Sequence, residues 1–180
     1  MSQEARVEDF ESLQKRVCFI NEVYHQSALI EEFIRGTEFT VPVIGNDPPE
    51  AMPVVQISID GTVELGDKFY SFERITSPEL KYVCPAQIPQ GLTQQLQQLA
   101  RRVFESVGCR DMGRVDFRVD EKGQPFVLEI NPLPYLGHED VFNFFPKVLG
   151  TTYEEIINRI LDCALKRYGL YEPENVMLKS

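Results

Sequence analysis

The sequence predicts an α+β fold in which an antiparallel β-sheet is flanked by helices. Apolar residues recur at three- and four-residue spacing in three segments, which is the pattern of amphipathic helices. Between these segments lie short stretches of alternating or continuous apolar residues that are typical of strands. Turn signals of the hairpin type join some of these stretches, and hairpins connect antiparallel strands.

The first helix is expected over 5–24, where apolar residues follow a helical period. Two strands should follow at 28–34 and 37–45, joined by a tight turn at Arg35-Gly36. The proline-rich stretch 46–50 predicts a loop.

The next strand is expected over 53–59, and Asp60-Gly61 supplies a hairpin-type turn after it. Residues 66–90 show no clean period and contain Pro78, Pro85 and Pro89, so they are expected to form a long loop. Long ordered loops in compact domains are often functional lids.

A second helix is expected over Thr93–Val107, capped by its first residue and ended by Gly108. The last helix should begin near Thr152, which can form a capping box with Glu155, and should end at Gly169.

Composition narrows the class of protein. With 180 residues, 43% of them hydrophobic and 26% charged, the chain resembles an ordinary soluble protein with one domain or two small lobes. No apolar run approaches the roughly 20 residues that cross a bilayer, and the polar N-terminus MSQEARVEDFESLQKR does not resemble a signal peptide. Both observations predict a cytoplasmic protein that does not bind membranes.

The charge balance and the cysteines exclude further classes. The formal net charge of −10 argues against a nucleic-acid partner, which needs a basic footprint. An anionic small molecule remains compatible if a metal ion and local Arg or Lys residues offset the field. The four cysteines are widely spaced without a CxxC pair, so neither a zinc site nor a disulfide framework is indicated.

The most informative segment is the hairpin formed by GRVDFRV and QPFVLEIN. If Asp120 lies opposite Pro125 across the turn, then Asp116 lies opposite Glu129 and Arg114 lies opposite Asn131. Alternation then separates an apolar core face from a polar face. The core face holds Val115, Phe117, Val119, Phe126, Leu128 and Ile130, whereas the polar face holds Arg114, Asp116, Arg118, Val127, Glu129 and Asn131.

Two directly opposed carboxylates repel each other unless they are solvated, protonated or bridged by a cation. Asn131 adds a neutral oxygen beside Asp116 and Glu129, and such oxygen ligands suit magnesium or manganese. Arg114 could hold a phosphoryl or carboxylate oxygen beside them. The alternative is a solvated hairpin face with loose ion pairs, but the stiff apolar segment NPLPYLG that follows makes this alternative less favourable.

The segment GRVDFRVDEKGQPFVLEINPLP resembles the closing motif of the ATP-grasp superfamily, and most closely the C-terminal region of D-alanine–D-alanine ligases. The stretches ALIEEFIRGTEFTV, KYVCPA and VGCRDMGRVD agree with it in order and spacing. The resemblance extends from about residue 28 to about residue 167. It implies that the sheet and its helices are the C-terminal part of an ATP-grasp fold.

The resemblance implies roles for matching positions around the phosphates. Asp116, Glu129 and Asn131 would hold two Mg²⁺ (or Mn²⁺) ions that bridge the phosphates of ATP. Arg114 would be the catalytic residue that contacts the substrate carboxylate and the transferred phosphoryl group. Arg74 stands where the family usually has a lysine, in a stretch that aligns with a substrate-covering loop, and would help to bind the nucleotide.

The resemblance also implies contacts with the nucleoside. Glu31 would accept a hydrogen bond from the adenine amino group, and the backbone of Phe33 and Ile34 would pair with the adenine edge. Glu38 would bind the ribose hydroxyls, and Leu128 would pack on the purine. From the residues alone, both glutamates could equally be solvated side chains at a strand edge.

The implied activity is that of a carboxylate–amine ligase. ATP would phosphorylate a carboxylate to an acylphosphate, and an amine such as an amino acid would then displace phosphate. Two departures from D-alanine–D-alanine ligases bear on the substrates. The family has a glycine at Tyr135 and, at Asp140, a serine that grips the carboxylate of the acceptor, so an acceptor with a cationic group is an alternative.

The first glycine is Gly36, whereas the family has a glycine-rich phosphate loop, two lysines and an N-terminal domain before this point. The sequence therefore predicts an N-terminal helix of a truncated subdomain over 1–27, the ATP-grasp C-terminal domain over 28–170 and a tail over 171–180. The N-terminal half would act in cis or in trans, and the isolated chain is expected to bind nucleotide weakly without ligating. The alternative is a truncated, non-catalytic module that binds nucleotide or a partner. A homodimer is compatible with either function.

Overall fold

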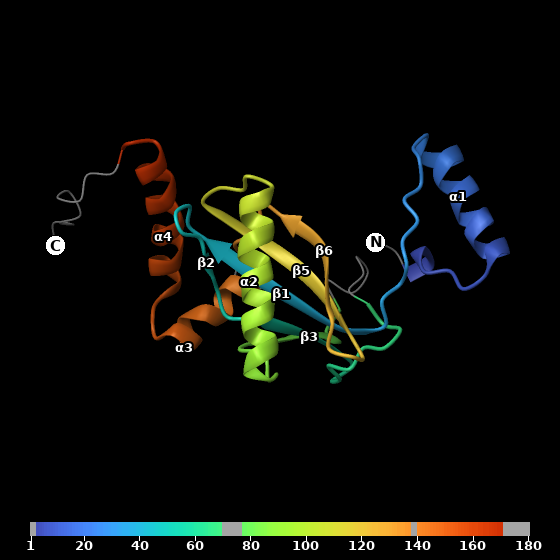
Figure 1. The fold of residues 1–180 in the computed structure, drawn as a ribbon, viewed down its shortest axis with the longest axis horizontal. Helices are drawn as coiled ribbons and strands as arrows, with labels where there is room; N and C mark the ends of the chain where they lie inside the picture. The colour runs from blue at the N-terminus through green and yellow to red at the C-terminus, as the bar shows by residue number, and fades with distance from the viewer. Residues whose placement is uncertain (1–2, 70–76, 138–139, 171–180) are drawn as a thin grey trace.

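The computed structural model describes residues 3–69, 77–137 and 140–170, which form one antiparallel sheet with helices around it (Figure 1). The strand order is β4-β3-β1-β5-β6, and β2 pairs with the end of β1. The predicted α+β class with an antiparallel sheet is therefore confirmed. In chain order the elements are η1 (Gln3–Ala5), α1 (Phe10–Tyr24), β1 (Gly36–Ile44), β2 (Glu50–Ala51), β3 (Val55–Ile59), β4 (Leu80–Val83), α2 (Gln90–Ser106), β5 (Met112–Asp120), β6 (Pro125–Asn131), η3 (Val141–Phe144), α3 (Phe145–Leu149) and α4 (Tyr153–Arg167).

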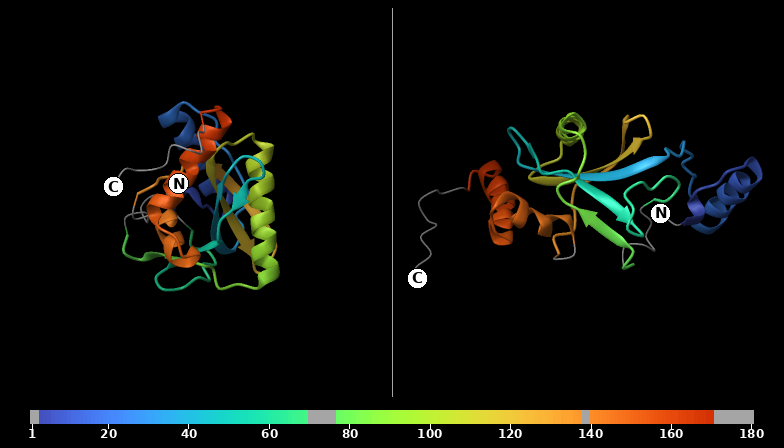
Figure 2. Two further views of the ribbon diagram at one scale, coloured as in Figure 1. Left: turned by 90° about the vertical axis from the view of Figure 1, so that its left-hand side faces the viewer. Right: turned by 90° about the horizontal axis from the view of Figure 1, so that it is seen from below.

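The centre of the sheet is the pairing of β1 with β5, which runs without a break from Gly36 opposite Asp120 to Ile44 opposite Met112. Side chains alternate between two faces along each strand. On one face, α2 crosses both strands, as the two views agree (Figures 1 and 2). Its buried residues, spaced by four, are Leu96, Ala100 and Phe104, and they pack against Phe39, Val41, Val43, Val115, Phe117 and Val119.

The opposite face is covered at one end by the C-terminal helices. Phe142 of η3, Phe145 of α3 and Ile156 of α4 form a second core with Ile44 and Val55. Ile44 lies four residues beyond Thr40 and so shares its face of β1. The stretch of this face toward the start of β1 carries the polar side chains described below.

A network of charged hydrogen bonds attaches the end of α4 to the start of β5. Arg167 donates to both carboxylate oxygens of Asp111, at 3.1 and 2.6 Å, and Asn46 donates to the same carboxylate at 2.8 Å. Asp111 has a positive φ of 66°, a backbone conformation that Asp and Asn tolerate better than most residues. The hydrogen bonds from Arg167 are the main reason why the pKa of Asp111 lies below its usual range.

Helix α1 lies apart from the sheet, at the end opposite to α4 (Figure 1). Asp9 caps it by accepting from the backbone N–H of Ser12 at 2.7 Å, but α1 contributes no buried residue. The predicted helix over 5–24 is thus confirmed in kind and begins at Phe10. Among the described residues, no helix has the length and apolar character needed to cross a membrane.

The prediction of a strand over 28–34 with a turn at Arg35-Gly36 is wrong. Residues 28–35 form no regular element, and Gly36 is the first residue of β1. An apolar run becomes a strand only if a neighbouring strand pairs with it, and the described residues supply none. Gly36 instead allows the backbone of β1 to lie close to that of β5. Its φ is 151°, and a Cβ there would lie 1.9 Å from the carbonyl oxygen of Val119.

Two further boundaries differ from the prediction. Helix α2 begins at Gln90, three residues before Thr93. Its N-cap is Pro89, which makes no side-chain cap hydrogen bond but whose fixed φ is compatible with the start of a helix. The expected loop 66–90 contains strand β4, whose alternation is too short to be recognised without its partner β3.

Residues 70–76, which include Arg74, and the expected tail over 171–180 lie outside the described residues. The division of the chain into 1–27, 28–170 and 171–180 stays a prediction.

Other predictions about elements are confirmed. Asp60 and Gly61 both have positive φ, and Ile59 and Thr62 exchange backbone hydrogen bonds across them, as a two-residue hairpin turn requires. Helix α4 begins with the expected capping box between Thr152 and Glu155.

We predict that Asp111→Asn lowers the free energy of unfolding by about 1–3 kcal/mol at pH 7, because it removes the charge that Arg167 pairs with and keeps a side chain suited to the positive φ. Urea unfolding of both proteins measures this difference. Because the pKa of folded Asp111 is lowered, its contribution is present above the unfolded pKa and is lost as the pH falls through the folded pKa. The difference should therefore shrink on acidification, and a pH-independent difference would contradict this account.

Candidate functional site

The face of the sheet opposite α2 carries a row of polar side chains from three adjacent strands. In the register of β1 with β5, Glu38 lies opposite Arg118, Thr40 opposite Asp116 and Pro42 opposite Arg114. In the register of β5 with β6, Asp116 lies opposite Glu129 and Arg114 opposite Asn131. The two opposed pairs predicted for the hairpin are thus confirmed.

A β-bulge at Leu128 corrects the rest of the hairpin prediction. Val119, and not Asp120, lies opposite Pro125, and the register shifts by one residue between Phe117 and Asp116. The assumed pairing at the turn was wrong by one residue, and the bulge shifts the register by one residue in the compensating direction. The pairs beyond the bulge, Asp116 with Glu129 and Arg114 with Asn131, are therefore as predicted. Bulges commonly re-aim side chains near functional sites.

The bulge also changes which face three residues of β6 occupy. Val127 lies opposite Phe117 and therefore shares the core face, whereas Phe126 lies opposite Arg118 and shares the polar face. The prediction had assigned both residues to the other faces. Leu128, expected in the apolar core, keeps 51% of its surface exposed because the extra residue has no partner across the ladder.

Asp116 is held by two neighbours on this face. Arg114 donates from Nε and Nη2 to the two carboxylate oxygens, both at 3.0 Å, and Thr40 donates its hydroxyl to Oδ1 at 2.6 Å. The side chains of Arg114 and Asp116 are 15% and 19% exposed. Asp116 is therefore pinned with its oxygens on the polar face, beside the exposed Glu129 across the ladder.

Asp140 adds a further carboxylate at the end of the row nearest η3. Its Oδ2 lies 3.8 Å from Nη1 of Arg114, and its side chain accepts from the backbone N–H of Val141 at the start of η3. Burial raises the pKa of Asp140, and the Val141 N–H and Arg114 oppose this shift only in part. The family resemblance had identified Asp140 as a departure from the usual serine, but the sequence did not predict its contact with Arg114.

At the other end of the row, Arg118 and Glu38 form a buried ion pair. Nη1 of Arg118 donates to Oε1 of Glu38 at 2.8 Å, and the two side chains are 3% and 7% exposed. Nη2 donates to the carbonyl oxygens of Gly66 at 2.8 Å and Lys68 at 3.0 Å. Burial lowers the pKa of Arg118, and the charge of Glu38 opposes this shift. Arg118 was predicted on this face, but no role was assigned to it.

The segment before β1 lies against this ion pair. The guanidinium carbon of Arg118 is 4.6 Å from the ring centre of Phe33, and Phe33 packs edge-on against Phe69. Phe33 and Ile34 are half-buried, whereas Glu31 is exposed. The predicted nucleoside-binding positions therefore lie at the same end of the face as Glu38.

The residues of the polar face suit a hard divalent cation. Asp116, Glu129 and Asn131 offer side-chain oxygens as ligands. In the described parts of the chain, no three or more His, Cys, Asp or Glu side chains lie close enough together to hold a metal ion by themselves. Oxygen donors with sites left for water and phosphate are typical of magnesium. The carboxylates of Asp116, Glu129 and Asp140 also bring more negative charge than Arg114 can neutralise.

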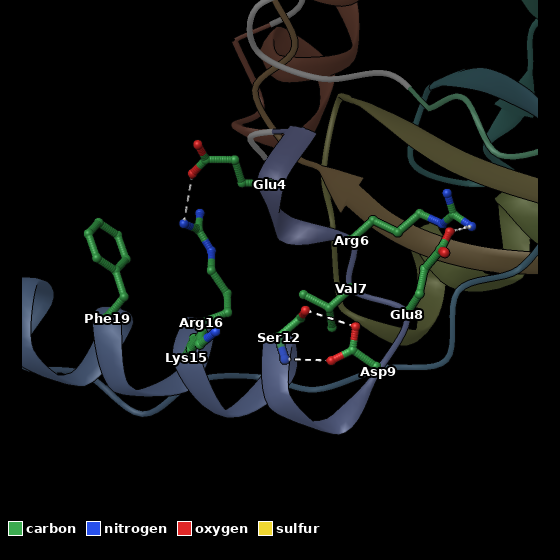
Figure 3. Close-up of a pocket in the computed structure, with 9 residues that line it drawn as sticks. All are labelled: Glu4, Arg6, Val7, Glu8, Asp9, Ser12, Lys15, Arg16 and Phe19. Atoms are coloured by element: carbon green, nitrogen blue, oxygen red, sulfur yellow. Dashed lines mark hydrogen bonds and ion pairs between the residues drawn. The ribbon is translucent and has the colours of Figure 1, made fainter.

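A separate hollow of about 600 Å³ lies between η1, the following segment and α1 (Figure 3). Four of its charged side chains form ion pairs within the hollow: Arg16 with Glu4 at 3.1 Å and Arg6 with Glu8 at 2.8 Å. It is remote in sequence from the polar row and open to solvent. We therefore take the sheet face, and not this hollow, as the candidate functional site.

Comparison with known proteins identifies the family to which the chain belongs. The architecture is the C-terminal part of an ATP-grasp fold, and the family model "D-ala D-ala ligase C-terminus" matches residues 5–162. The chain belongs to this family. A D-alanine–D-alanine ligase of Pelotomaculum thermopropionicum is 33% identical over 148 residues, which are 82% of this chain and 45% of that protein. An uncharacterised protein, y4sG, of Sinorhizobium fredii is 36% identical over 156 residues, which are 87% of this chain and 46% of that protein.

Solved structures share the fold at lower identity. A D-alanine–D-alanine ligase from Coxiella burnetii matches 91% of this chain and 41% of its own, with a TM-score of 0.69 and 23% identity. A Bacillus anthracis ligase in complex with ATP matches 91% and 49%, with a TM-score of 0.70 and 20% identity. The chain thus spans about half the length of the relatives it matches.

We predict that Glu38→Ala destabilises the protein by about 3–5 kcal/mol, because it leaves the buried charge of Arg118 without its partner. Urea unfolding at neutral pH measures the loss. The double variant Glu38→Leu with Arg118→Met removes both charges and should recover much of it. A loss below 1 kcal/mol for Glu38→Ala would mean that the ion pair is not buried as described.

Proposed function

We propose that the chain is the nucleotide- and metal-binding C-terminal portion of an ATP-dependent carboxylate–amine ligase of the D-alanine–D-alanine ligase type. The observation that carries this proposal is the order of groups along the polar face. Phe33 and Ile34 precede β1, Glu38 and Arg118 lie at its start, Asp116 follows, and Arg114 lies beyond it. ATP presents adenine, ribose and phosphates in the same sequence.

The spacing along the strands supports this order. Residues two apart in a strand are separated by about 6.6 Å, so one such step leads from Glu38 to Thr40 and its partner Asp116. A nucleotide with its adenine against Phe33 and Ile34 and its ribose at Glu38 would therefore extend its phosphates toward Asp116 and Glu129. The half-exposed Leu128, placed beside Glu129 by the bulge, is available to pack on the purine.

Asp116, Glu129 and Asn131 would hold Mg²⁺ at the phosphates. The bound metal would neutralise phosphate charge and so favour phosphoryl transfer. Arg114 would pair with the developing phosphoryl or carboxylate oxygens, because its guanidinium already lies beside Asp116 and within 3.8 Å of Asp140. Thr40 would keep Asp116 oriented through its hydrogen bond.

The reaction that these groups suit is the activation of a carboxylate as an acylphosphate, followed by attack of an amine. Each step needs positioning and charge neutralisation rather than a nucleophile on the protein. The substrates would be ATP and an amino acid or another small carboxylate and amine. Asp140 next to Arg114 favours an acceptor that does not present its own carboxylate there.

A further part of the ligase would pack against the N-terminal region, in cis or in trans. Large apolar side chains are exposed on α1 and just after it, with 78% exposure for Phe10, 82% for Leu29 and 60% for Ile30. Exposed apolar side chains mark an interface where they gather into one patch, and these side chains are available for such a contact. The same surface would suit the alternative, a non-catalytic module that binds a partner.

We expect Glu129→Ala to weaken the binding of Mg-ADP at least tenfold in titration calorimetry, because a carboxylate ligand of the metal is lost. The affinity for ADP without a divalent cation should change little. Glu121→Ala removes the same charge in the exposed hairpin turn and is the matched control. Equal affinity of wild type and Glu129→Ala for Mg-ADP would remove the metal site from the proposal.

We also expect the 180-residue chain alone to bind Mg-ADP weakly and to release no phosphate from ATP when amino acids are added. A phosphate-release assay over a panel of amino acids measures this. Addition of a separately produced N-terminal half of a related ligase should restore turnover if the two parts act in trans. Steady ATP-dependent phosphate release by the chain alone would contradict this part of the proposal.

A further inference from the structure

The side chain of Arg118 contacts three segments of the structure at once. Its guanidinium contacts β1 through Glu38 and the carbonyl oxygen of Gly36, and it contacts the loop after β3 through Gly66 and Lys68. It also lies over the ring of Phe33, which precedes β1. One side chain from β5 thus fixes three separate segments at one end of the polar face.

A purely stabilising function does not explain this arrangement well. A buried ion pair is weak evidence for stability, because removing two charges from water offsets most of their attraction. Apolar residues of similar volume would hold these segments at least as firmly. What the ion pair adds is a fixed orientation for the carboxylate of Glu38, since the planar guanidinium donates in defined directions.

We propose that Arg118 is a positioning residue that orients Glu38 toward the ribose hydroxyls and so makes the site selective for ribonucleotides. This inference rests on the proposed nucleotide-binding function. The side chain of Glu38 is only 7% exposed, so a hydroxyl can reach it in few orientations. A carboxylate that rotated freely would accept poorly from two adjacent hydroxyls, whereas one held by Nη1 of Arg118 at 2.8 Å presents a constant geometry.

The position of Phe33 supports the same conclusion. Because Arg118 contacts both Phe33 and Glu38, it fixes the distance between the expected adenine-binding segment and the expected ribose acceptor. The base and the sugar of a nucleoside are joined by one bond, so their binding groups must keep a fixed separation.

The test compares the dissociation constants of Mg-ADP and of Mg-2′,3′-dideoxy-ADP by titration calorimetry. For the wild type we expect ADP to bind about tenfold more tightly, since hydrogen bonds to a buried carboxylate are lost in the dideoxy compound. Arg118→Lys keeps the positive charge but loses the planar guanidinium that donates in fixed directions. Glu38 would then no longer be oriented, so ADP binding should weaken about tenfold. Binding of dideoxy-ADP should change less than twofold, and the ratio should approach one.

Arg167→Lys is the matched control, because Arg167 also donates two hydrogen bonds to one carboxylate but lies at the end of α4. It should lower the melting temperature and leave the ratio between the two nucleotides at the wild-type value. If Arg118→Lys does not fold at the assay temperature, Arg118→Gln keeps a buried donor and replaces it in the comparison. Melting curves by circular dichroism establish which variants are folded.

The outcomes separate the two proposals. If the wild type does not bind Mg-ADP, the proposed function fails and the role of Arg118 fails with it. If the wild type binds both nucleotides equally, or if folded Arg118→Lys keeps the wild-type ratio, Arg118 does not position Glu38 for ribose although the proposed function stands. A ratio that falls to one in Arg118→Lys and is unchanged in Arg167→Lys supports the inference.

Discussion

The structure depends on the unbroken antiparallel pairing of β1 with β5. These two strands share nine consecutive register pairs and lie in the middle of the sheet. The pairing sends Phe39, Val41 and Val43 with their partners toward α2, and it leaves the intervening residues on the opposite face. A slip by one residue would place Asp116 and Arg118 in the apolar core, so the same packing that stabilises the fold also defines the site.

The polar face is organised by ion pairs within the row and across the strands. Arg114 holds the half-buried Asp116 and Arg118 holds the buried Glu38, so both carboxylates have a cation beside them. Such pairs contribute little net stability, but removing one partner strongly lowers the free energy of unfolding. Their retention on one face is better explained by the orientation they give to oxygen atoms. The same explanation applies to the proposed metal ligand Asp116 and to the proposed ribose acceptor Glu38, because an arginine orients each of them.

The hairpin shows how far the sequence could predict the site. Alternation along GRVDFRV and QPFVLEIN predicted that Asp116 and Glu129 oppose each other, and the structure confirms this pairing. The bulge at Leu128 was not predicted, because a bulge depends on how two strands twist together and has no local signal in this segment. Its consequence was a wrong face for Phe126 and Val127 and a wrong environment for Leu128.

Other failures have the same non-local origin. Residues 28–34 have the composition of a strand, but strand formation requires a partner that local sequence does not reveal. The contacts of Arg118 with Glu38, Gly66 and Phe33 join positions up to 85 residues apart along the chain, and no spacing rule anticipates them. Helix caps depend on local sequence, and the capping box of α4 was predicted correctly, although Pro89 and not Thr93 is the N-cap of α2.

The most direct test of the central claim, that the face carrying Asp116, Glu129 and Asn131 binds a metal–nucleotide complex, is paramagnetic broadening by Mn²⁺-ADP. Substoichiometric Mn²⁺-ADP is added to the ¹⁵N-labelled chain, and the loss of each amide signal is measured by NMR. The account predicts that the signals of these three residues disappear first, while those of Leu96 and Ala100 in α2, on the opposite face, persist. Earliest broadening in α1 or α2, or equal broadening throughout the chain, would contradict it.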